Sequence, residues 1–425
     1  MKNAARLRDH GASRLRSAGM DAAGMTAPGT RVPRRLAAGL LAALLFACGD
    51  DPASDFGDGG SFPVDGSRVD AGPTDGGSED GGQPDAFEAD ANAPEPDAGV
   101  EDPTVSSEFW LADPDTVLGL DGSYISYGTT IGPGQGPRCG GVGELFVPYL
   151  VHGSGNTVGI SDCAAGDAMP SGPGAWAEGA IWAPGVARYG DRYFMYYTAS
   201  RRGTGQKCVG RAVASAARGP FTDQGEWACP PMGRWAIDAN PIVADGQLLV
   251  AYRDDAINSF PETGLSVVRT DANGWADWST RRDLLRSTDV DWETIAVSGT
   301  SRVIENPSLF LHEGLWYVTY SGNNWDSPRY ATGLALCGPS PLPATPCTPL
   351  RDGVRRPYFG FMGDGDLDPY RGLPGNHEGP GGMDVFNAAD GSLRVIWHWW
   401  QRSDGTRRSA VGRLLEDDGG FWVGP

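Results

Sequence analysis

The stretch "VIENPSLFLHEGLWYVTYSG", residues 303–322, carries the pattern that decides the fold. A strand-like apolar run follows Glu305, Gly314 marks a turn, and a second run rich in aromatic residues comes after it. Two such runs joined by a glycine turn predict a β-hairpin. The position of Glu305 at the start of an apolar hairpin needs an explanation, because burial disfavours an ionised carboxylate.

The same pattern occurs four more times in the chain. The other copies are "ADPDTVLGLDGSYISYGT" (112–129), "IWAPGVARYGDRYFMYYTAS" (181–200), "AIDANPIVADGQLLVAYRDD" (236–255) and "GPGGMDVFNAADGSLRVIWHWW" (379–400). Their turn glycines are Gly122, Gly190, Gly246, Gly314 and Gly391. No helical period separates the five units, so the sequence predicts an all-β, five-bladed β-propeller over residues 106–425.

Three of the five hairpins carry an acid near the start of the first strand. Asp113, Asp238 and Glu305 lie eight or nine residues before their turn glycines. Equivalent positions in a propeller surround the central axis, so we expect these three carboxylates to meet at one end of the channel. The matching places in the other two hairpins hold Ile181 and Trp182, and Gly382 and Met383.

Carboxyl groups held close together in a desolvated pocket cannot all ionise at neutral pH, so at least one has a raised pKa and keeps a proton to donate. An acid, a base and a stacking aromatic ring are what cleavage of a glycosidic bond requires. A single acid before a strand often only caps or opens the strand. Three acids in one register favour a shared catalytic pocket.

Several segments together resemble glycoside hydrolase family 43 over residues 108–425. They are "ADPDT", "GDAMPSGPGAWAEGAIWAP", "ARGPFTDQGEWACPP", "AIDANP", "LLRSTDVDWE", "VIENPSLF", "YSGNNWDSPRYATGLALC" and "GPGGMDVF". The resemblance implies a five-bladed propeller and an inverting hydrolase that acts on arabinofuranosyl or xylosyl linkages of pentose polysaccharides and oligosaccharides.

The resemblance also implies roles for individual residues. Asp113 matches the general base that activates water, and Glu305 matches the general acid that protonates the departing oxygen. Asp238 matches the carboxylate that adjusts the pKa of the acid. Trp182, in "WAP", matches a wall of the sugar pocket, and Arg253, in "YRDD", stands where a basic residue contacts the acid.

The chain departs from the family pattern at three places. Gly185 follows "WAP" where an acid is usual, and Ala239 replaces a proline. Gly382, in "GPGG", replaces a histidine that helps to hold a central ion in many members and marks a separate branch. We therefore assign no metal and no cofactor, and we interpret His377 and His398 as packing residues.

The N-terminal region predicts export. The basic stretch "RVPRR" precedes the apolar run "LAAGLLAALLFA", residues 36–47, which suits a signal peptide and is too short to span a bilayer. It ends in "LFAC", which resembles a lipobox, so residues 1–47 are predicted to be removed and Cys48 lipidated. The alternative is an ordinary signal peptide with an incidental cysteine. The expected location is a bacterial membrane, at the cell surface or in the periplasm.

Residues 48–105 are rich in Asp, Gly, Pro, Ser and Ala, and they predict a disordered acidic tether. Its aspartates match no known calcium-binding loop. Residues 103–425 also carry an excess of acids within the overall net charge of −20. A domain this acidic is not expected to bind nucleic acid. No G-x-S-x-G elbow and no glycine-rich loop before a helix is present, which disfavours a serine hydrolase and a nucleotide-binding protein.

Six cysteines remain after Cys48, which suits disulfides in an exported chain. Six cysteines allow 15 connectivities. We predict the nearest-neighbour pairs Cys139–Cys163, Cys208–Cys229 and Cys337–Cys347, and the family resemblance supports the last two.

The leading hypothesis is thus a lipid-anchored, monomeric glycosidase of the arabinofuranosidase, arabinanase or xylosidase type. One alternative is a glycosidase of the same fold with another sugar substrate. A second alternative is a lectin that binds carbohydrate in the same pocket without cleaving it, although binding alone does not require three acids.

Overall fold

The computed structural model describes the propeller region and leaves out the N-terminal segments. The described residues are 111–132, 143–154, 164–259, 262–290, 302–350, 357–359, 371–373, 377–401, 403 and 405–424. The predicted signal segment, Cys48, the tether and the pair Cys139–Cys163 lie outside these residues, and those predictions stand as they were. Among the described residues, no helix is long and apolar enough to cross a membrane.

The described strands form five antiparallel four-stranded sheets, each built from strands consecutive in sequence. Blade 1 contains β1 (Asp115–Leu118), β2 (Ser123–Tyr127), β3 (Pro148–Ser154) and β4 (Gly166–Asp167). Blade 2 contains β5 (Ala177–Tyr189), β6 (Arg192–Arg201), β7 (Lys207–Ala214) and β8 (Thr222–Ala228). Blade 3 contains β9 (Ala236–Ala244), β10 (Gln247–Asp254), β11 (Gly264–Arg269) and β12 (Arg282–Arg286).

The remaining two blades follow the same plan. Blade 4 contains β13 (Ile304–His312), β14 (Leu315–Gly322), β15 (Ala331–Gly338) and β16 (Thr348–Leu350). Blade 5 contains β17 (Glu378–Asn387), β18 (Leu393–Gln401), β19 (Thr406–Asp417) and β20 (Gly420–Gly424). Helical structure in the described part is limited to the 3₁₀ turns η1 (Asp255–Ile257), η2 (Trp278–Thr280) and η3 (Ser287–Asp289).

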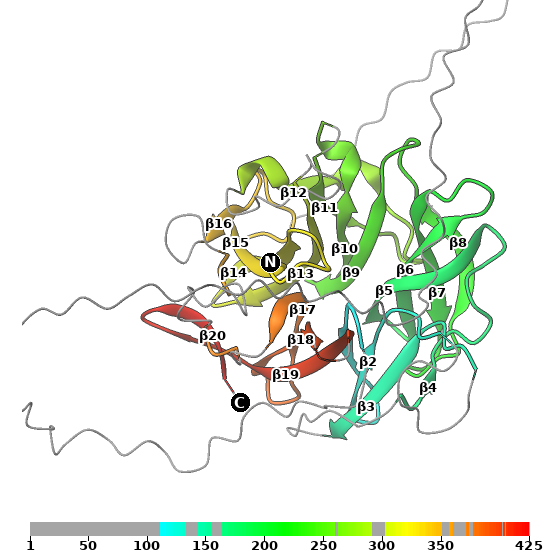
Figure 1. The fold of residues 1–425 in the computed structure, drawn as a ribbon, viewed down its shortest axis with the longest axis horizontal. Coiled ribbons are helices and arrows are strands. Elements are labelled where there is room, and N and C mark those ends of the chain that lie inside the picture. Colours follow the sequence, from blue (N-terminus) through cyan, green and yellow to red (C-terminus); the bar gives the residue numbers. More distant parts are fainter. Residues whose placement is uncertain are drawn as a thin grey trace, which may run out of the picture. The chain divides into compact units, whose positions relative to one another are not determined.

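The first strands of the five sheets, β1, β5, β9, β13 and β17, surround a common centre (Figure 1). The predicted all-β, five-bladed propeller is therefore confirmed. The five predicted hairpin turns are confirmed as well, since each turn glycine has a positive φ, between 64° and 82°. Glycine adopts this backbone conformation without the steric cost that a β-carbon brings.

Five apolar clusters hold the blades together, one between each pair of neighbouring sheets. The cluster between blades 5 and 1 includes Tyr124 and Ile396, both fully buried. The aromatic second runs noted in the sequence thus pack sheet against sheet, which is how a propeller removes its apolar surfaces from water.

Two of the three predicted disulfides fall in the described region, and both are present. Cys208–Cys229 joins β7 to the segment after β8, and Cys337–Cys347 joins β15 to the segment before β16.

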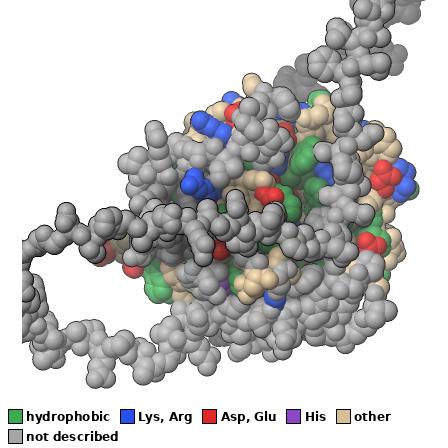
Figure 2. All heavy atoms as spheres, in the orientation of Figure 1, with side chains coloured by type: hydrophobic (Ala, Val, Ile, Leu, Met, Phe, Trp, Pro, Cys, Tyr) green, Lys and Arg blue, Asp and Glu red, His purple; other side chains and the backbone are tan. Residues whose placement is uncertain are grey.

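Acidic side chains do not form one continuous patch on the face shown in Figure 2. There, the described Asp and Glu side chains lie among Lys, Arg and hydrophobic side chains.

A belt of polar side chains joins all five inner strands across the channel. Asn240 of β9 donates from Nδ2 to Asp115 Oδ1 of β1 (2.9 Å) and to Asp384 Oδ1 of β17 (3.1 Å). Asp384 also accepts Ser308 Oγ of β13 (2.9 Å) and the Thr116 amide (2.9 Å). The amide of Val186 in β5 donates to Asp115 Oδ2 (2.8 Å).

Replacing Asp384 by alanine should lower the free energy of unfolding by about 3 kcal/mol, because donors from three blades, two of them buried, would lose this acceptor. Urea denaturation at pH 7.5 measures the change. Asp191→Ala is a matched control, because its side chain is 97% exposed on a hairpin turn. Equal effects of the two substitutions would show that the belt does not contribute to the free energy of unfolding.

Candidate active site

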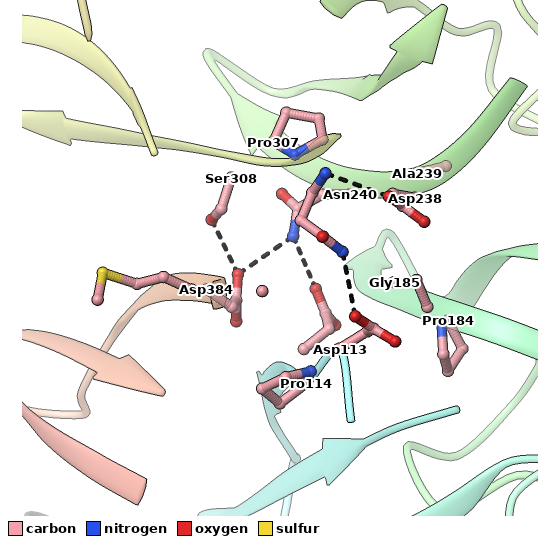
Figure 3. Close-up of a pocket in the computed structure, with 15 residues that line it drawn as sticks. Asp113, Pro114, Pro184, Gly185, Asp238, Ala239, Asn240, Pro307, Ser308 and Asp384 are labelled. Carbon is pink, nitrogen blue, oxygen red and sulfur yellow. Dashed lines mark hydrogen bonds between the residues drawn. The ribbon is translucent and has the colours of Figure 1, made fainter. Parts of the chain in front are cut away.

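The five inner strands share one backbone feature, within the strand or, in blade 1, just before it. Five residues there, one per blade, have left-handed φ values of 41° to 55°: Asp113, Ala183, Asp238, Asn306 and Gly382. Together with the two residues that follow each, they line a cavity of about 30 Å³ at the centre of the propeller (Figure 3). Asp, Asn and Gly tolerate this conformation better than other residues, so the site selects small or short polar residues at these places.

This feature corrects the predicted register of one acid. Asp113 and Asp238 are equivalent to each other, as expected, but their equivalent in blade 4 is Asn306. Glu305 lies one residue earlier, in the place that Trp182 holds in blade 2. Asp238 and Asn306 each lie eight residues before their turn glycines, whereas Glu305 lies nine residues before Gly314. Asp113 also lies nine residues before its turn glycine, because the β1–β2 turn is longer than the turns of blades 3 and 4.

Despite the offset, the structure brings the three acids into one network through Asn306. The Asn306 amide donates to Asp238 Oδ2 (3.2 Å), and its Nδ2 lies 3.5 Å from Asp113 Oδ1. Its Oδ1 accepts the hydroxyl of Tyr330 (2.8 Å), which also lies 3.0 Å from Glu305 Oε1. Figure 3 shows Asp113 and Asp238 among the residues that line the central cavity.

Asp113 is surrounded by groups that favour its ionised form. Arg407 Nη1 lies 3.3 Å and 3.2 Å from its two carboxylate oxygens, and Thr129 Oγ1 donates to Oδ2 (2.8 Å). Burial alone would raise the pKa of Asp113, but the positive charge of Arg407, the nearby His398 and the hydrogen bonds bring it below its usual value. Asp113 is therefore an ionised carboxylate at neutral pH.

Glu305 has the opposite balance. Burial raises its pKa, Arg253 and Tyr330 oppose the rise, and the charge of Asp113 adds to it, so that the net pKa is raised. Arg253 Nη1 donates to Oε2 at 2.9 Å. Because Oε2 faces this cationic donor, a neutral Glu305 carries its proton on Oε1.

Asp238 is 8% exposed, and its amide donates to Thr198 Oγ1 (3.0 Å). Burial, then repulsion from Glu305 and Asp113, raise its pKa well above the usual value. The Asp238–Glu305 pair therefore holds a proton over a wider pH range than either carboxyl group would in water.

The predicted pocket residues Trp182 and Arg253 also lie here, each with a partner. Lys207 Nζ lies 3.6 Å from the centre of the Trp182 ring and donates to Ser200 Oγ (2.7 Å). Burial lowers the pKa of Lys207 to about 8. One face of Trp182 is thus covered by an ammonium group. Arg253 is held by Asp255 in a buried ion pair at 2.9 Å.

Gly185 and Gly382, where the sequence departs from the family pattern, have a steric explanation. A β-carbon on Gly185 would lie 2.2 Å from the Ala239 carbonyl oxygen, so no side chain fits there. A β-carbon on Gly382 would lie 2.7 Å from Nδ1 of His398. His398 thus fills the space that a residue larger than glycine would need.

The interpretation of His377 and His398 as packing residues is correct for the first and incomplete for the second. His377 stacks on Trp399 at 4.1 Å. His398 stacks on Tyr330 at 5.8 Å, but its Nδ1 also accepts the amide of Asp113 (3.0 Å). Nε2 therefore carries the ring hydrogen, and His398 has no free lone pair for a metal. The described residues at this site therefore do not fit a central ion that is bound by a histidine.

Sequence reasoning missed Arg407, Thr129, Tyr330 and Asn306. Asn306 was adjacent to a predicted residue, and a search for residues that tolerate left-handed backbone would have found it. The other three lie outside the first strands of the blades, at positions where no residue type is repeated from blade to blade, and only the fold brings them to the site.

The chain matches a known protein family. The family model described as "Glycosyl hydrolases family 43" matches residues 161–414, more than half of the chain. The chain belongs to glycosyl hydrolase family 43. That this family-43 chain lies in a branch marked by GPGG stays a prediction.

Individual relatives of this family-43 chain are distant. The probable arabinan endo-1,5-alpha-L-arabinosidases A of Aspergillus flavus and Aspergillus oryzae are each 27% identical over 231 residues, which are 52% of this chain. The chain spans 62% of the length of these two curated relatives.

Solved structures share the fold. A thermostable family-43 glycoside hydrolase is 21% identical with a TM-score of 0.57, covering 76% of this chain and 96% of its own. An alpha-L-arabinofuranosidase from Lactobacillus brevis is 18% identical with a TM-score of 0.54, covering 75% of this chain and 95% of its own.

Proposed function

We propose that the protein is an inverting glycoside hydrolase that cleaves arabinofuranosyl or xylosyl linkages in pentose polysaccharides or oligosaccharides. The observation that carries this proposal is that an ionised carboxylate, Asp113, and a carboxyl group of raised pKa, Glu305, are joined in one hydrogen-bond network through Asn306 and Tyr330. Family membership and the arabinosidase relatives support it.

Asp113 acts as the general base in this proposal. Its two oxygens are oriented by Arg407 and Thr129, which leaves the carboxylate fixed and charged. A water molecule between Asp113 and the anomeric carbon would lose its proton to Asp113 as it attacks from the face opposite the leaving group. Inversion of the anomeric centre follows from that direction of attack.

Glu305 acts as the general acid. Its Oε1 proton is delivered to the glycosidic oxygen as the bond to the anomeric carbon breaks, and Arg253 stabilises the carboxylate that results. Repulsion between Asp238 and Glu305 makes it unfavourable to ionise both, so the pair retains a proton that Glu305 can donate at higher pH.

The role of Asp238 predicts a change in the pH profile. Activity falls on the basic side as Glu305 loses its proton. Asp238→Asn removes a negative charge beside Glu305, so the pKa of Glu305 should fall and the basic limb of kcat/KM should move to lower pH. An unmoved basic limb would exclude this role, whatever the effect on the maximal rate.

A panel of defined linear arabino- and xylo-oligosaccharides, with the anomer of the first product read by NMR, tests the proposal. The expected result is cleavage of at least one series with an inverted product. A retained anomer contradicts the roles given to Asp113 and Glu305. Binding of a series without any cleavage would instead support a lectin.

We also propose that the protein is exported and held to a membrane by a lipid on Cys48. The apolar run 36–47, the "LFAC" sequence and the disulfides suit an exported chain. In a bacterial host, radiolabelled palmitate should enter the wild type and not the Cys48→Ser variant. Equal labelling of both would remove Cys48 as the lipid site.

A further inference from the structure

Each of the two proposed catalytic carboxylates is held by an arginine, and each arginine lies against an exposed indole ring. Arg253, which contacts Glu305, lies 5.3 Å from the centre of the Trp235 ring. Arg407, which contacts Asp113, lies 5.0 Å from the centre of the Trp325 ring. Trp235 is 39% exposed and Trp325 is 38% exposed, unusual values for the largest apolar side chain.

The backbone of Trp235 is hydrogen-bonded to the residue that holds Arg253. Its amide donates to Asp255 Oδ2 (3.2 Å), and its carbonyl oxygen accepts the amide of Asp255 (3.0 Å). Asp255 in turn holds Arg253 at 2.9 Å. The backbone of Trp235 is therefore fixed immediately before β9, three residues from Asp238.

Trp325 is fixed by a second tryptophan. It stacks on Trp400 with 5.6 Å between ring centres and 26° between planes. Trp400 Nε1 donates to the Trp325 carbonyl oxygen at 2.7 Å. Trp325 follows β14 of blade 4, and Trp400 lies near the end of β18 of blade 5.

The two indoles lie on different sides of the proposed acid. Trp235 precedes the first strand of blade 3, whereas Trp325 lies against blade 5, and Glu305 belongs to blade 4 between them. A substrate that reached both rings would extend from blade 3 to the contact between blades 4 and 5, past the blade that carries Glu305.

We propose that Trp235 and Trp325 are stacking platforms for sugar rings on the two sides of the cleaved linkage, so that the site takes an internal stretch of a linear pentose chain. This inference rests on the proposed function and deepens it. The apolar C–H face of a sugar ring can cover an exposed indole, and a cation at an indole polarises the ring and orients it.

A third tryptophan supplies a matched control. Trp275 is 37% exposed and has Arg211 at 4.1 Å from its ring centre. It lies beyond the end of β11, where Thr270 bonds to the Leu248 carbonyl oxygen at the start of β10. Because Arg253 lies at the other end of β10, Trp275 lies at the end of the blade away from the site.

The test compares Trp235→Ala, Trp325→Ala and Trp275→Ala on arabino- and xylo-oligosaccharides of two to six units and on an aryl pentoside. For each platform variant, the ratio of kcat/KM on the six-unit chain to that on the aryl pentoside should fall about tenfold. The ratio should not change for Trp275→Ala. Wild-type products from the six-unit chain should include fragments longer than one unit from both ends.

Two results would overturn the inference while the proposed function stands. One is an unchanged ratio in both platform variants, and the other is release of single sugars only from one chain end. If the wild type cleaves nothing, the proposed function fails. In that case, calorimetry measures the affinity of the six-unit chain for Glu305→Gln and for the same variant with Trp235→Ala or Trp325→Ala added. An affinity that either added substitution leaves unchanged rejects the stacking platforms.

Discussion

Glu305→Gln is expected to lower kcat on an unactivated pentose oligosaccharide by about 10³-fold, the usual contribution of a positioned general acid. The glutamine keeps the size of the side chain but has no proton acidic enough to give to the glycosidic oxygen. On a nitrophenyl pentoside the loss should be much smaller, because nitrophenolate departs without full protonation. Initial rates on both substrates, compared with the wild type, measure this difference.

Glu313→Gln is the matched control for this substitution. Glu313 is an exposed residue on the turn of the β13–β14 hairpin, at the other end of the strand that carries Glu305. We expect wild-type rates from it. Equal losses on both substrates for Glu305→Gln would show that Glu305 supports the site in some way other than proton donation.

Asp113→Asn should lower kcat by about 10³-fold as well, but with a different signature. Asparagine cannot take a proton from the attacking water. Water must attack the anomeric carbon in both substrates, whatever the leaving group is. The loss should therefore be similar on the oligosaccharide and on the nitrophenyl pentoside. The acidic limb of the remaining activity should also vanish, since in the wild type it reports protonation of Asp113.

Asp121→Asn is the control for the base. Asp121 lies on the exposed turn of the β1–β2 hairpin and pairs with Arg218 at 3.1 Å. If the loss in Asp113→Asn depended strongly on the leaving group, Asp113 would be assisting departure, and the roles of Asp113 and Glu305 would need to be exchanged.

The sequence alone was sufficient for the fold because each blade has a local signature. A glycine turn between two apolar runs is short-range information, and it marked Gly122, Gly190, Gly246, Gly314 and Gly391 correctly. Asp113, Asp238 and Glu305 were accessible to the same reasoning because they stand at fixed offsets from these turns.

The rest of the site depends on contacts that no local pattern encodes. Arg407 is 294 residues from Asp113 in sequence, and Tyr330 reaches Glu305 from a different strand of the same blade. The one-residue offset of Glu305 was hidden because Asp113 and Glu305 both lie nine residues before their turn glycines, and only the structure shows that the β1–β2 turn is the longer one.

Blades 1 and 5 share no strand, since each is built from its own consecutive segment. Side-chain contacts join them instead, among them those of Arg407 and His398 with Asp113. The acidic half of the catalytic pair, by contrast, is complete within blades 3 and 4. Catalytic turnover should therefore require the contacts between blades 1 and 5 to be in place. A molecule in which blade 5 (378–424) has not yet folded, or has detached, would be catalytically inactive even with its acid in place.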